Sequence, residues 1–179
     1  MSREIFSKRI KEHSLSGGAK LYTFKTATDD VVSIKGSFLG GHVYAKKHNP
    51  LLSEFVWRLL DKGTKRLKRE EVEEKIESRG ISLDFSADSH RIRFSLLTRK
   101  KFLVEALDLL FEMLSVPRFD EADIKNEKVI LQGEIDESHV DTYRRGGVEL
   151  SRIMFDRNHP NFSLSSEESK KALPDVSKE

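Results

Sequence analysis

The sequence predicts an α+β fold in which an antiparallel sheet packs against helices. Segments with the apolar–polar alternation of strands occur in neighbouring pairs, whereas segments with helical periodicity follow one another in runs. A doubly wound parallel sheet would instead alternate strands and helices along the chain. The 179 residues are enough for one domain with a hydrophobic core, so we expect a single domain over residues 1–179.

Two strand-like segments come first. Residues 19–25 (AKLYTFK) and 30–39 (DVVSIKGSFL) alternate apolar and polar side chains, and turn-forming residues 28–30 separate them. We therefore expect these two strands to pair. The Ser and Gly residues at 14–18 predict a flexible turn rather than a phosphate-binding loop, because no helix beginning with Lys-Ser/Thr follows. Residues 40–48 are expected to form a loop.

A helix is predicted over residues 50–62. Asn49 is placed to cap it, Pro50 suits its first turn and Gly63 ends it. Apolar side chains fill one half of the helical wheel: Leu51, Leu52, Phe55, Val56, Leu59 and Leu60. The other half carries the chain's only tryptophan beside two charged residues, namely Glu54, Trp57 and Arg58. Because a large ring rarely faces water without a reason, this second face invites a functional explanation.

A charged helix and a hairpin follow. The segment KREEVEEKIESRG (residues 68–80) has charges spaced for i,i+4 pairs and a terminal glycine, Gly80. Alternating apolar residues then predict an antiparallel hairpin, with Ile81, Leu83 and Phe85 on one strand and, across the turn SADSH, Ile92, Phe94 and Leu96 on the other. One face of this hairpin should be buried.

The second half of the chain is predicted to be helical. Residues 100–115 are strongly apolar, and Asp120 is placed to cap a long helix over residues 121–138 that buries Ile124, Leu131 and Ile135. A helix over residues 142–155, weakened by two glycines, precedes a loop over residues 156–166. Residues 174–179 have the pattern of a helix start with Ser177 as its cap, so we expect a chain truncated at its C-terminal end.

Composition excludes several classes of protein. Lys plus Arg number 32 and Asp plus Glu 30, and the basic runs lack interleaved aromatic residues, so nucleic-acid binding is not predicted. No cysteine is present, which excludes disulfides and thiolate zinc sites. The six histidines show no i,i+3 or i,i+4 pairing. Without a signal-like start or an apolar run of about 20 residues, we expect a soluble, cytoplasmic chain with no membrane span.

Several phrases, in this order, resemble a known family. LLDKGTKR after an amphipathic helix, then KREEVEEKIESRGISLDFSADSHRIRFSLL, then ALDLLFEMLSVPRFDEADIKNEKVILQGEI are similar to the pitrilysin/insulinase zinc metallopeptidases, which include mitochondrial processing peptidase. The resemblance extends from about residue 20 to residue 179. It implies the processing-peptidase-like metallohydrolase fold.

The resemblance also implies a zinc site. Active members carry H-x-x-E-H on the first helix, where two histidines hold zinc and the glutamate activates the metal-bound water; a glutamate on the later long helix is the third ligand. The corresponding positions here begin at Glu54 and include Trp57 and Arg58, so both histidines and the base are replaced. The third-ligand position falls at Glu134, and a supporting glutamate falls at Glu127.

These five residues are interpreted as a degenerate former zinc site with no catalytic residue and no metal ligand. Arg58 is expected to face Glu134 and Glu127 and to compensate their charge in place of the metal. Apart from the resemblance, Glu54 and Arg58 would be an ordinary i,i+4 surface pair and the other two glutamates ordinary helix-edge acids. An all-oxygen site made by Glu54, Glu127 and Glu134, suited to magnesium, calcium or manganese, is the alternative that Arg58 opposes.

Taken together, the resemblance implies a catalytically inactive half of such a peptidase. In this family an active and an inactive half face each other and enclose a chamber for extended peptides, which can add a strand to a sheet edge. We therefore expect the chain to be partner and chamber wall for an H-x-x-E-H half in a homo- or hetero-oligomer, with zinc only in that half. Two alternatives remain: a structural or assembly subunit without peptide handling, and a metallopeptidase with a relocated metal site.

Overall fold

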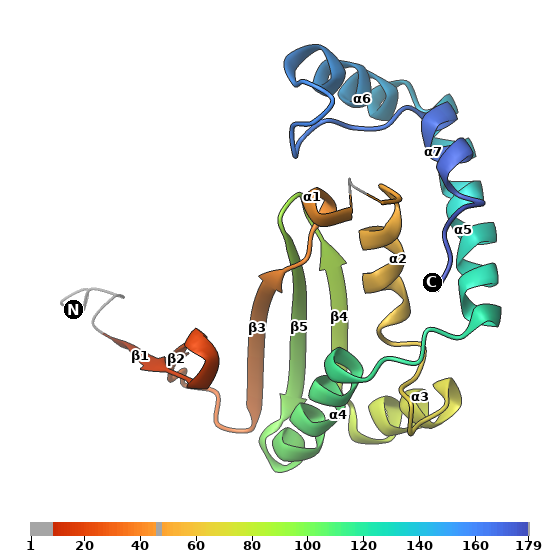
Figure 1. Cartoon of the computed structure of the whole chain (residues 1–179). Helices are drawn as coiled ribbons and strands as arrows, with labels where there is room; N and C mark the ends of the chain where they lie inside the picture. The colour runs from red at the N-terminus through yellow and green to blue at the C-terminus, as the bar shows by residue number, and fades with distance from the viewer. Residues whose placement is uncertain (1–8, 46–47, 179) are drawn as a thin grey trace. The chain divides into compact units, whose positions relative to one another are not determined.

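The computed structural model describes residues 9–45 and 48–178, and the chain divides into two compact units, residues 1–31 and 32–179 (Figure 1). The prediction of a single domain over residues 1–179 stays a prediction. Within the described ranges no helix has the length and apolar character needed to cross a membrane.

The first unit is a β-hairpin. Strands β1 (Ile10–Ser14) and β2 (Lys20–Phe24) pair antiparallel, and the reversal between them uses Gly17 and Gly18 at φ of 80° and 82°, which glycine adopts without strain. The predicted pairing of residues 19–25 with residues 30–39 is therefore wrong. The tight glycine turn brings β2 onto the short polar segment before it, and that segment (IKEHS) lacks the apolar alternation by which a strand is predicted.

The second unit is built on a three-stranded sheet in the order β3-β5-β4 (Figure 1). Its strands are β3 (Val31–Leu39), β4 (Ser82–Ala87) and β5 (Arg91–Arg99). The predicted hairpin is confirmed, because β4 and β5 pair antiparallel with Phe85 opposite Phe94. At its turn the Asp88 carboxylate accepts hydrogen bonds from two backbone amides at 2.8 Å. An edge position for β4 is the feature that matters for the site.

Two helices cover one face of this sheet. These are α3 (Arg69–Arg79), which ends at Gly80 in the left-handed region, and α4 (Leu103–Ser115), which a 3-10 turn over Lys100–Phe102 precedes. The side chains buried between helices and sheet are Val72, Ile81, Leu96, Ala106, Leu109, Leu110 and Met113. The alternate strand residues Leu83 and Phe85 pack against this core, as the alternation predicts.

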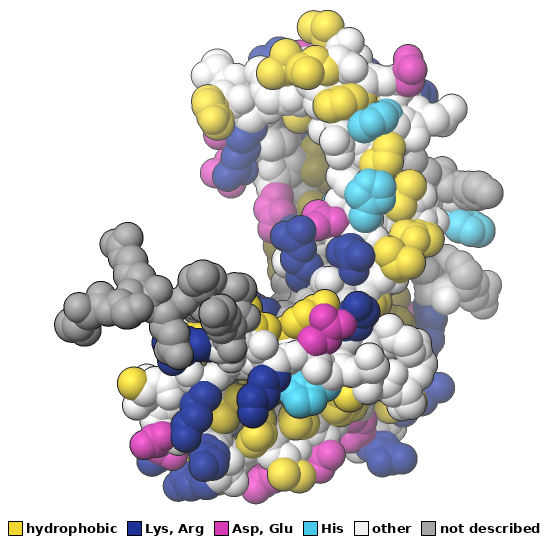
Figure 2. Space-filling model, turned by 90° about the vertical axis from the view of Figure 1, so that its left-hand side faces the viewer, with side chains coloured by type: hydrophobic (Ala, Val, Ile, Leu, Met, Phe, Trp, Pro, Cys, Tyr) yellow, Lys and Arg dark blue, Asp and Glu magenta, His cyan; other side chains and the backbone are white. Residues whose placement is uncertain are grey.

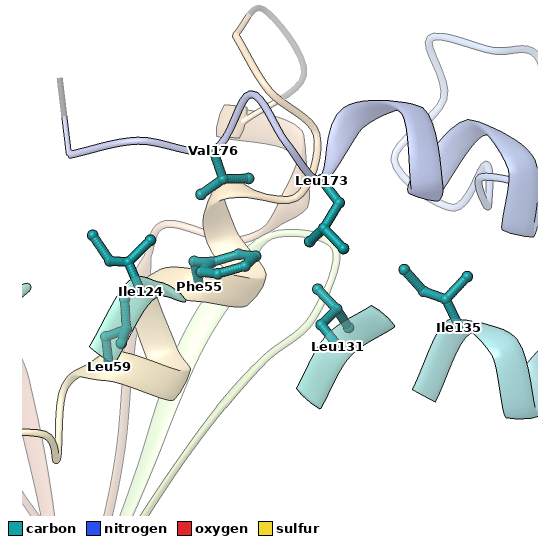
Figure 3. Close-up of a cluster of buried hydrophobic side chains, with 7 residues drawn as sticks. All are labelled: Phe55, Leu59, Ile124, Leu131, Ile135, Leu173 and Val176. Carbon is teal, nitrogen blue, oxygen red and sulfur yellow. The ribbon is translucent and has the colours of Figure 1, made fainter. Parts of the chain in front are cut away.

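A second core joins α2 (Leu52–Leu59) to α5 (Glu121–Val140). Figure 3 shows its seven side chains, which come from α2, from α5 and from the segment after α7: Phe55, Leu59, Ile124, Leu131, Ile135, Leu173 and Val176. The predicted apolar faces of both helices are thus confirmed. The Asp120 side chain accepts from the amide of Ala122, as expected of the cap of α5.

Helix α2 is shorter than the predicted 50–62. The predicted cap at Asn49 is wrong, because the N-cap position of α2 is Leu51; the Oδ1 of Asn49 accepts instead from the amide of Leu51 at 2.9 Å, in the turn before the helix. Pro50 and Leu51 form that turn, and the helix ends as the amide of Lys62 reaches back to the carbonyl of Leu59. Gly63 follows with φ of 118°, a backbone conformation that favours glycine, and the chain changes direction there after the helix.

The remaining helices are α1 (His42–Ala45), α6 (Thr142–Met154) and α7 (Ser166–Ala172). Helix α6 was predicted; α1 and α7 were not. The capping box between Ser165 and Glu168 begins α7 where a loop had been expected to end. Residues 174–178 form a turn and an irregular segment, and the predicted helix start with Ser177 as its cap stays a prediction, because the helix it would begin lies beyond the described residues.

Helix α6 buries none of its side chains. Figure 2 shows hydrophobic side chains gathered over this helix at the top of the view. The large apolar residues that α6 leaves exposed are Tyr143, Leu150, Ile153 and Met154.

Candidate functional site

Helices α2 and α5 bring the five predicted site residues together around one guanidinium. Glu54, Trp57 and Arg58 lie one turn apart on α2, and Glu127 and Glu134 lie two turns apart on α5. The apolar faces of the two helices pack together in the second core, which places their polar edges side by side. We call these five residues the Arg58 cluster.

Arg58 contacts all three carboxylates of the cluster. Its Nη1 and Nη2 donate to the two oxygens of Glu134 at 3.0 and 2.6 Å, which is a bidentate pair. Its Nε donates to Glu54 at 2.8 Å, and its Nη1 lies 3.7 Å from Glu127. The predicted contacts of Arg58 with Glu54, Glu127 and Glu134 are therefore confirmed; the descent of this arrangement from a zinc site stays a prediction.

Trp57 lies against the guanidinium and is half-buried. Its ring centroid lies 4.9 Å from the central carbon of Arg58, within the range of a cation–π contact. Its Nε1 donates to the second oxygen of Glu54 at 3.0 Å. Both oxygens of Glu54 are thus engaged by its own helix, which holds the tryptophan and the arginine in fixed positions.

The electrostatics of the cluster depend on burial. Burial on its own would lower the pKa of Arg58, but hydrogen bonds to Glu134 and Glu54 outweigh it and raise that pKa above its ordinary value. Arg58 is therefore a permanent cation. Glu127 is only 7% exposed and accepts no hydrogen bond within the described part of the chain, so the distant guanidinium is its sole charged partner there.

A zinc ion does not fit this set of side chains. The zinc site that the resemblance implies needs two histidines and a glutamate, whereas here a guanidinium occupies the space between three carboxylates and would repel a cation. Within residues 9–45 and 48–178 no three His, Asp or Glu side chains are arranged to hold a metal ion. The same geometry disfavours the all-oxygen alternative at Glu54, Glu127 and Glu134.

A small pocket opens between this cluster and the edge of the sheet. Its volume is about 220 Å3, and we call it the α2–β4 pocket; its lining is Trp57, Arg58, Asp61, Lys62, Leu83, Asp84, Phe85 and Glu127. Five of these residues, at positions 61–62 and 83–85, were not predicted from the sequence to belong to a site. No local pattern could have indicated them, because they become neighbours only when α2 lies along β4.

A larger pocket of about 630 Å3 lies on the other side of Glu54, between the start of α2, α5 and the loop after α6. Its basic groups are engaged elsewhere. His42 Nδ1 lies 2.6 Å from the Ser53 hydroxyl, and Arg157 donates to Glu168 at 2.5 Å. In the α2–β4 pocket, by contrast, Glu127 has only its 3.7 Å ion pair with Arg58. The α2–β4 pocket is therefore the better candidate for the functional site.

Comparison with known proteins decides the family. The model of the insulinase family, peptidase family M16, matches residues 21–161, most of the chain. The chain belongs to the insulinase family. The predicted resemblance is thereby confirmed, and so is the α+β fold class. No curated protein sequence matches this M16 chain.

Two solved structures share the M16 fold of this chain. One is the inactive domain of a peptidase M16 from Pseudomonas fluorescens, with a TM-score of 0.85 and 15% identity over 94% of this chain. The other is a point mutant of the ferredoxin protease FusC in complex with Arabidopsis ferredoxin, with a TM-score of 0.72 and 15% identity over 99% of this chain. This M16 chain spans 41% of the first and 20% of the second.

Proposed function

We propose that this chain is a catalytically inactive half of an M16 peptidase, acting as partner and peptide-chamber wall for an active half. The observation that carries the proposal is the Arg58 cluster. A guanidinium is bound by three carboxylates where the family resemblance places the zinc ligands, and neither a histidine pair nor a general base is present there. The likeness in fold to an inactive M16 domain supports the same reading.

The edge of the sheet supports the peptide-wall part of the proposal. β4 pairs with β5 along one side, and within the described ranges no backbone hydrogen bond joins its other side to another strand. An extended peptide can add a strand to such an edge through main-chain hydrogen bonds. Zinc and the general base would be supplied by the active half, on a second chain or elsewhere on a longer natural chain.

The experiment is purification through a tag added at the natural gene, followed by mass spectrometry of the components. We expect an H-x-x-E-H sequence in equal amount and chelator-sensitive peptidase activity from the assembly, with no activity from the present chain alone. A tag on an unrelated protein of the same size is the control. Two results would contradict the proposal: absence of an H-x-x-E-H sequence, or chelator-sensitive cleavage by the pure chain that survives further purification.

A further inference from the structure

The face of the sheet that α3 and α4 leave uncovered is polar and exposed. Successive side chains of a strand point to opposite faces, and Ile34 of β3, Leu83 of β4 and Phe94 of β5 pack against the helices. The alternate positions of the three strands therefore belong to the opposite face, which we call the outer sheet face. Its charged residues, all exposed, are Lys35, Asp84, Arg91, Arg93 and Arg99. Most of its other residues are serines.

Positive charge is concentrated on the outer sheet face. Four cations and one carboxylate give this face a formal charge of +3, whereas the whole chain, with 32 basic and 30 acidic residues, has +2. Arg93 pairs with Asp88 at the turn between β4 and β5. Arg91 donates to the hydroxyl of Ser37 at 3.2 Å, and in the described part of the chain neither Arg91 nor Lys35 forms an ion pair with a carboxylate. Two cations of this face therefore lack an acidic partner there.

Hydration alone does not account for this distribution of charge. The open face of an antiparallel sheet is normally polar, but the chain as a whole has nearly equal numbers of both signs. Arg91 and Arg93 lie two positions apart on one strand, a separation of roughly 7 Å at which like charges repel. A ligand that carries negative charge would offset this repulsion and engage the two unpaired cations.

The side chains of the outer sheet face favour carboxylates among negatively charged ligands. An arginine binds a carboxylate through two parallel N–H donors, and the serines add O–H donors. None of the outward residues of β3, β4 and β5 is aromatic, so the bases of a nucleic acid would find no ring on which to stack. An acidic polypeptide needs no such ring.

We propose that the outer sheet face binds an acidic, extended segment of a partner protein. Alternate side chains of an extended chain are roughly 7 Å apart, so two carboxylates of such a segment match the spacing of Arg91 and Arg93. Lys35, on the neighbouring strand β3, is placed to engage a third carboxylate. The proposal goes beyond the peptide-chamber function and does not depend on it, because none of these three residues belongs to the Arg58 cluster or to the edge strand β4.

The test is fluorescence anisotropy of the full chain with two labelled, end-capped twelve-residue peptides. One alternates glutamate and serine, and the other has glutamine in place of every glutamate. We expect the glutamate peptide to bind at least about tenfold more tightly. The double variant Lys35→Gln, Arg91→Gln should reduce this difference to within about twofold. The matched control is Lys75→Gln, Lys125→Gln, which makes the same change in net charge at exposed positions of α3 and α5 and should leave the difference intact.

Three results would overturn the proposal. Equal binding of the two peptides, or binding of neither, would mean that the outer sheet face does not recognise carboxylates. An equal loss of affinity in both double variants would assign the binding to the net charge of the chain and not to this face. Tighter binding of a seven-nucleotide thymidine strand, which carries the same six charges as the glutamate peptide, would assign the face to nucleic acid. The proposed role as an inactive half is tested separately, by the purification experiment. Circular dichroism confirms that both double variants are folded.

Discussion

Arg58 and Glu134, 76 residues apart in the chain, form a bidentate ion pair with N–O distances of 3.0 and 2.6 Å. The pair ties α2 to α5 at the polar edge of the second core, where Glu54 and Glu127 also point at the guanidinium. The side chain of Arg58 is only 14% exposed, so little water reaches this place to solvate the carboxylates if the guanidinium is removed. Removing it would leave three carboxylates near one another.

Arg58→Ala should therefore destabilise the chain at neutral pH by about 2–4 kcal/mol, because it leaves the buried Glu127 without its cation. Urea unfolding at pH 7 measures the change. The matched control is Arg69→Ala, which removes an i,i+4 pair with Glu73 whose side chains are 44% and 50% exposed. That control should cost no more than about 0.5 kcal/mol. Equal costs for both variants would mean that the Arg58 cluster does not stabilise the fold.

Reinstalling the zinc motif tests the origin of the cluster. The triple variant Glu54→His, Trp57→Glu, Arg58→His has H-x-x-E-H on α2, and Glu134 is present on α5 as the third ligand. A histidine with a metal ion attached has a reach similar to that of an arginine side chain, so Glu134 should lie within bonding distance of the ion. We expect about one zinc per chain after dialysis, measured by elemental mass spectrometry, and loss of that zinc when Glu134→Ala is added. A folded triple variant without zinc would show that the proposed correspondence of positions is wrong.

Local sequence patterns predicted the helices and strands better than they predicted which strands pair. The cap at Asp120, the stop at Gly80 and the buried faces of α2 and α5 follow from residues within one or two turns, and all are observed. The pairing of β2 was wrong because strand partners are chosen over longer distances, and here the tight turn at Gly17 and Gly18 decides. Helix α7 was missed although its capping box, Ser165 with Glu168, is visible in the sequence.

The site shows the same division. The i,i+4 pair of Glu54 and Arg58 is a local pattern, but no periodicity relates Arg58 to Glu134; their contact was expected only from the family resemblance. The α2–β4 pocket was not predicted at all. Its shape depends on how far α2 stands from the edge of β4, and that distance is set by packing against the whole sheet.

A buried hydroxyl at Thr64 fixes the loop that follows α2. Its Oγ1 donates to Glu112 at 2.7 Å and accepts from the amides of Arg66 and Leu67 at 3.1 and 2.9 Å. Thr64→Val keeps the shape of the side chain but leaves both amides without an acceptor, so we expect a loss of about 1–3 kcal/mol in the free energy of unfolding. The control is Thr98→Val, at an equally buried threonine whose hydroxyl makes a long, weak hydrogen bond of 3.5 Å to the carbonyl of Arg99. If both variants lose the same stability, the hydroxyl of Thr64 has no special role.

Glu168 should make the free energy of unfolding depend on pH in the acidic range. Its backbone hydrogen bond from Ser165, together with Arg157 and Arg152, lowers its pKa to about 2 from an ordinary 4.5, although burial opposes the shift. A carboxylate with a lowered folded-state pKa stabilises the fold above its unfolded pKa, and the contribution disappears as pH falls from about 4.5 to about 2. Partial exposure limits the effect to roughly 1–2 kcal/mol. Glu168→Gln should lower stability at pH 7 and flatten this acid limb in urea titrations at pH 2, 3, 4.5 and 7, with the exposed Glu137→Gln as control. An acid limb as steep in Glu168→Gln as in the unchanged chain would assign the pH dependence to other carboxylates.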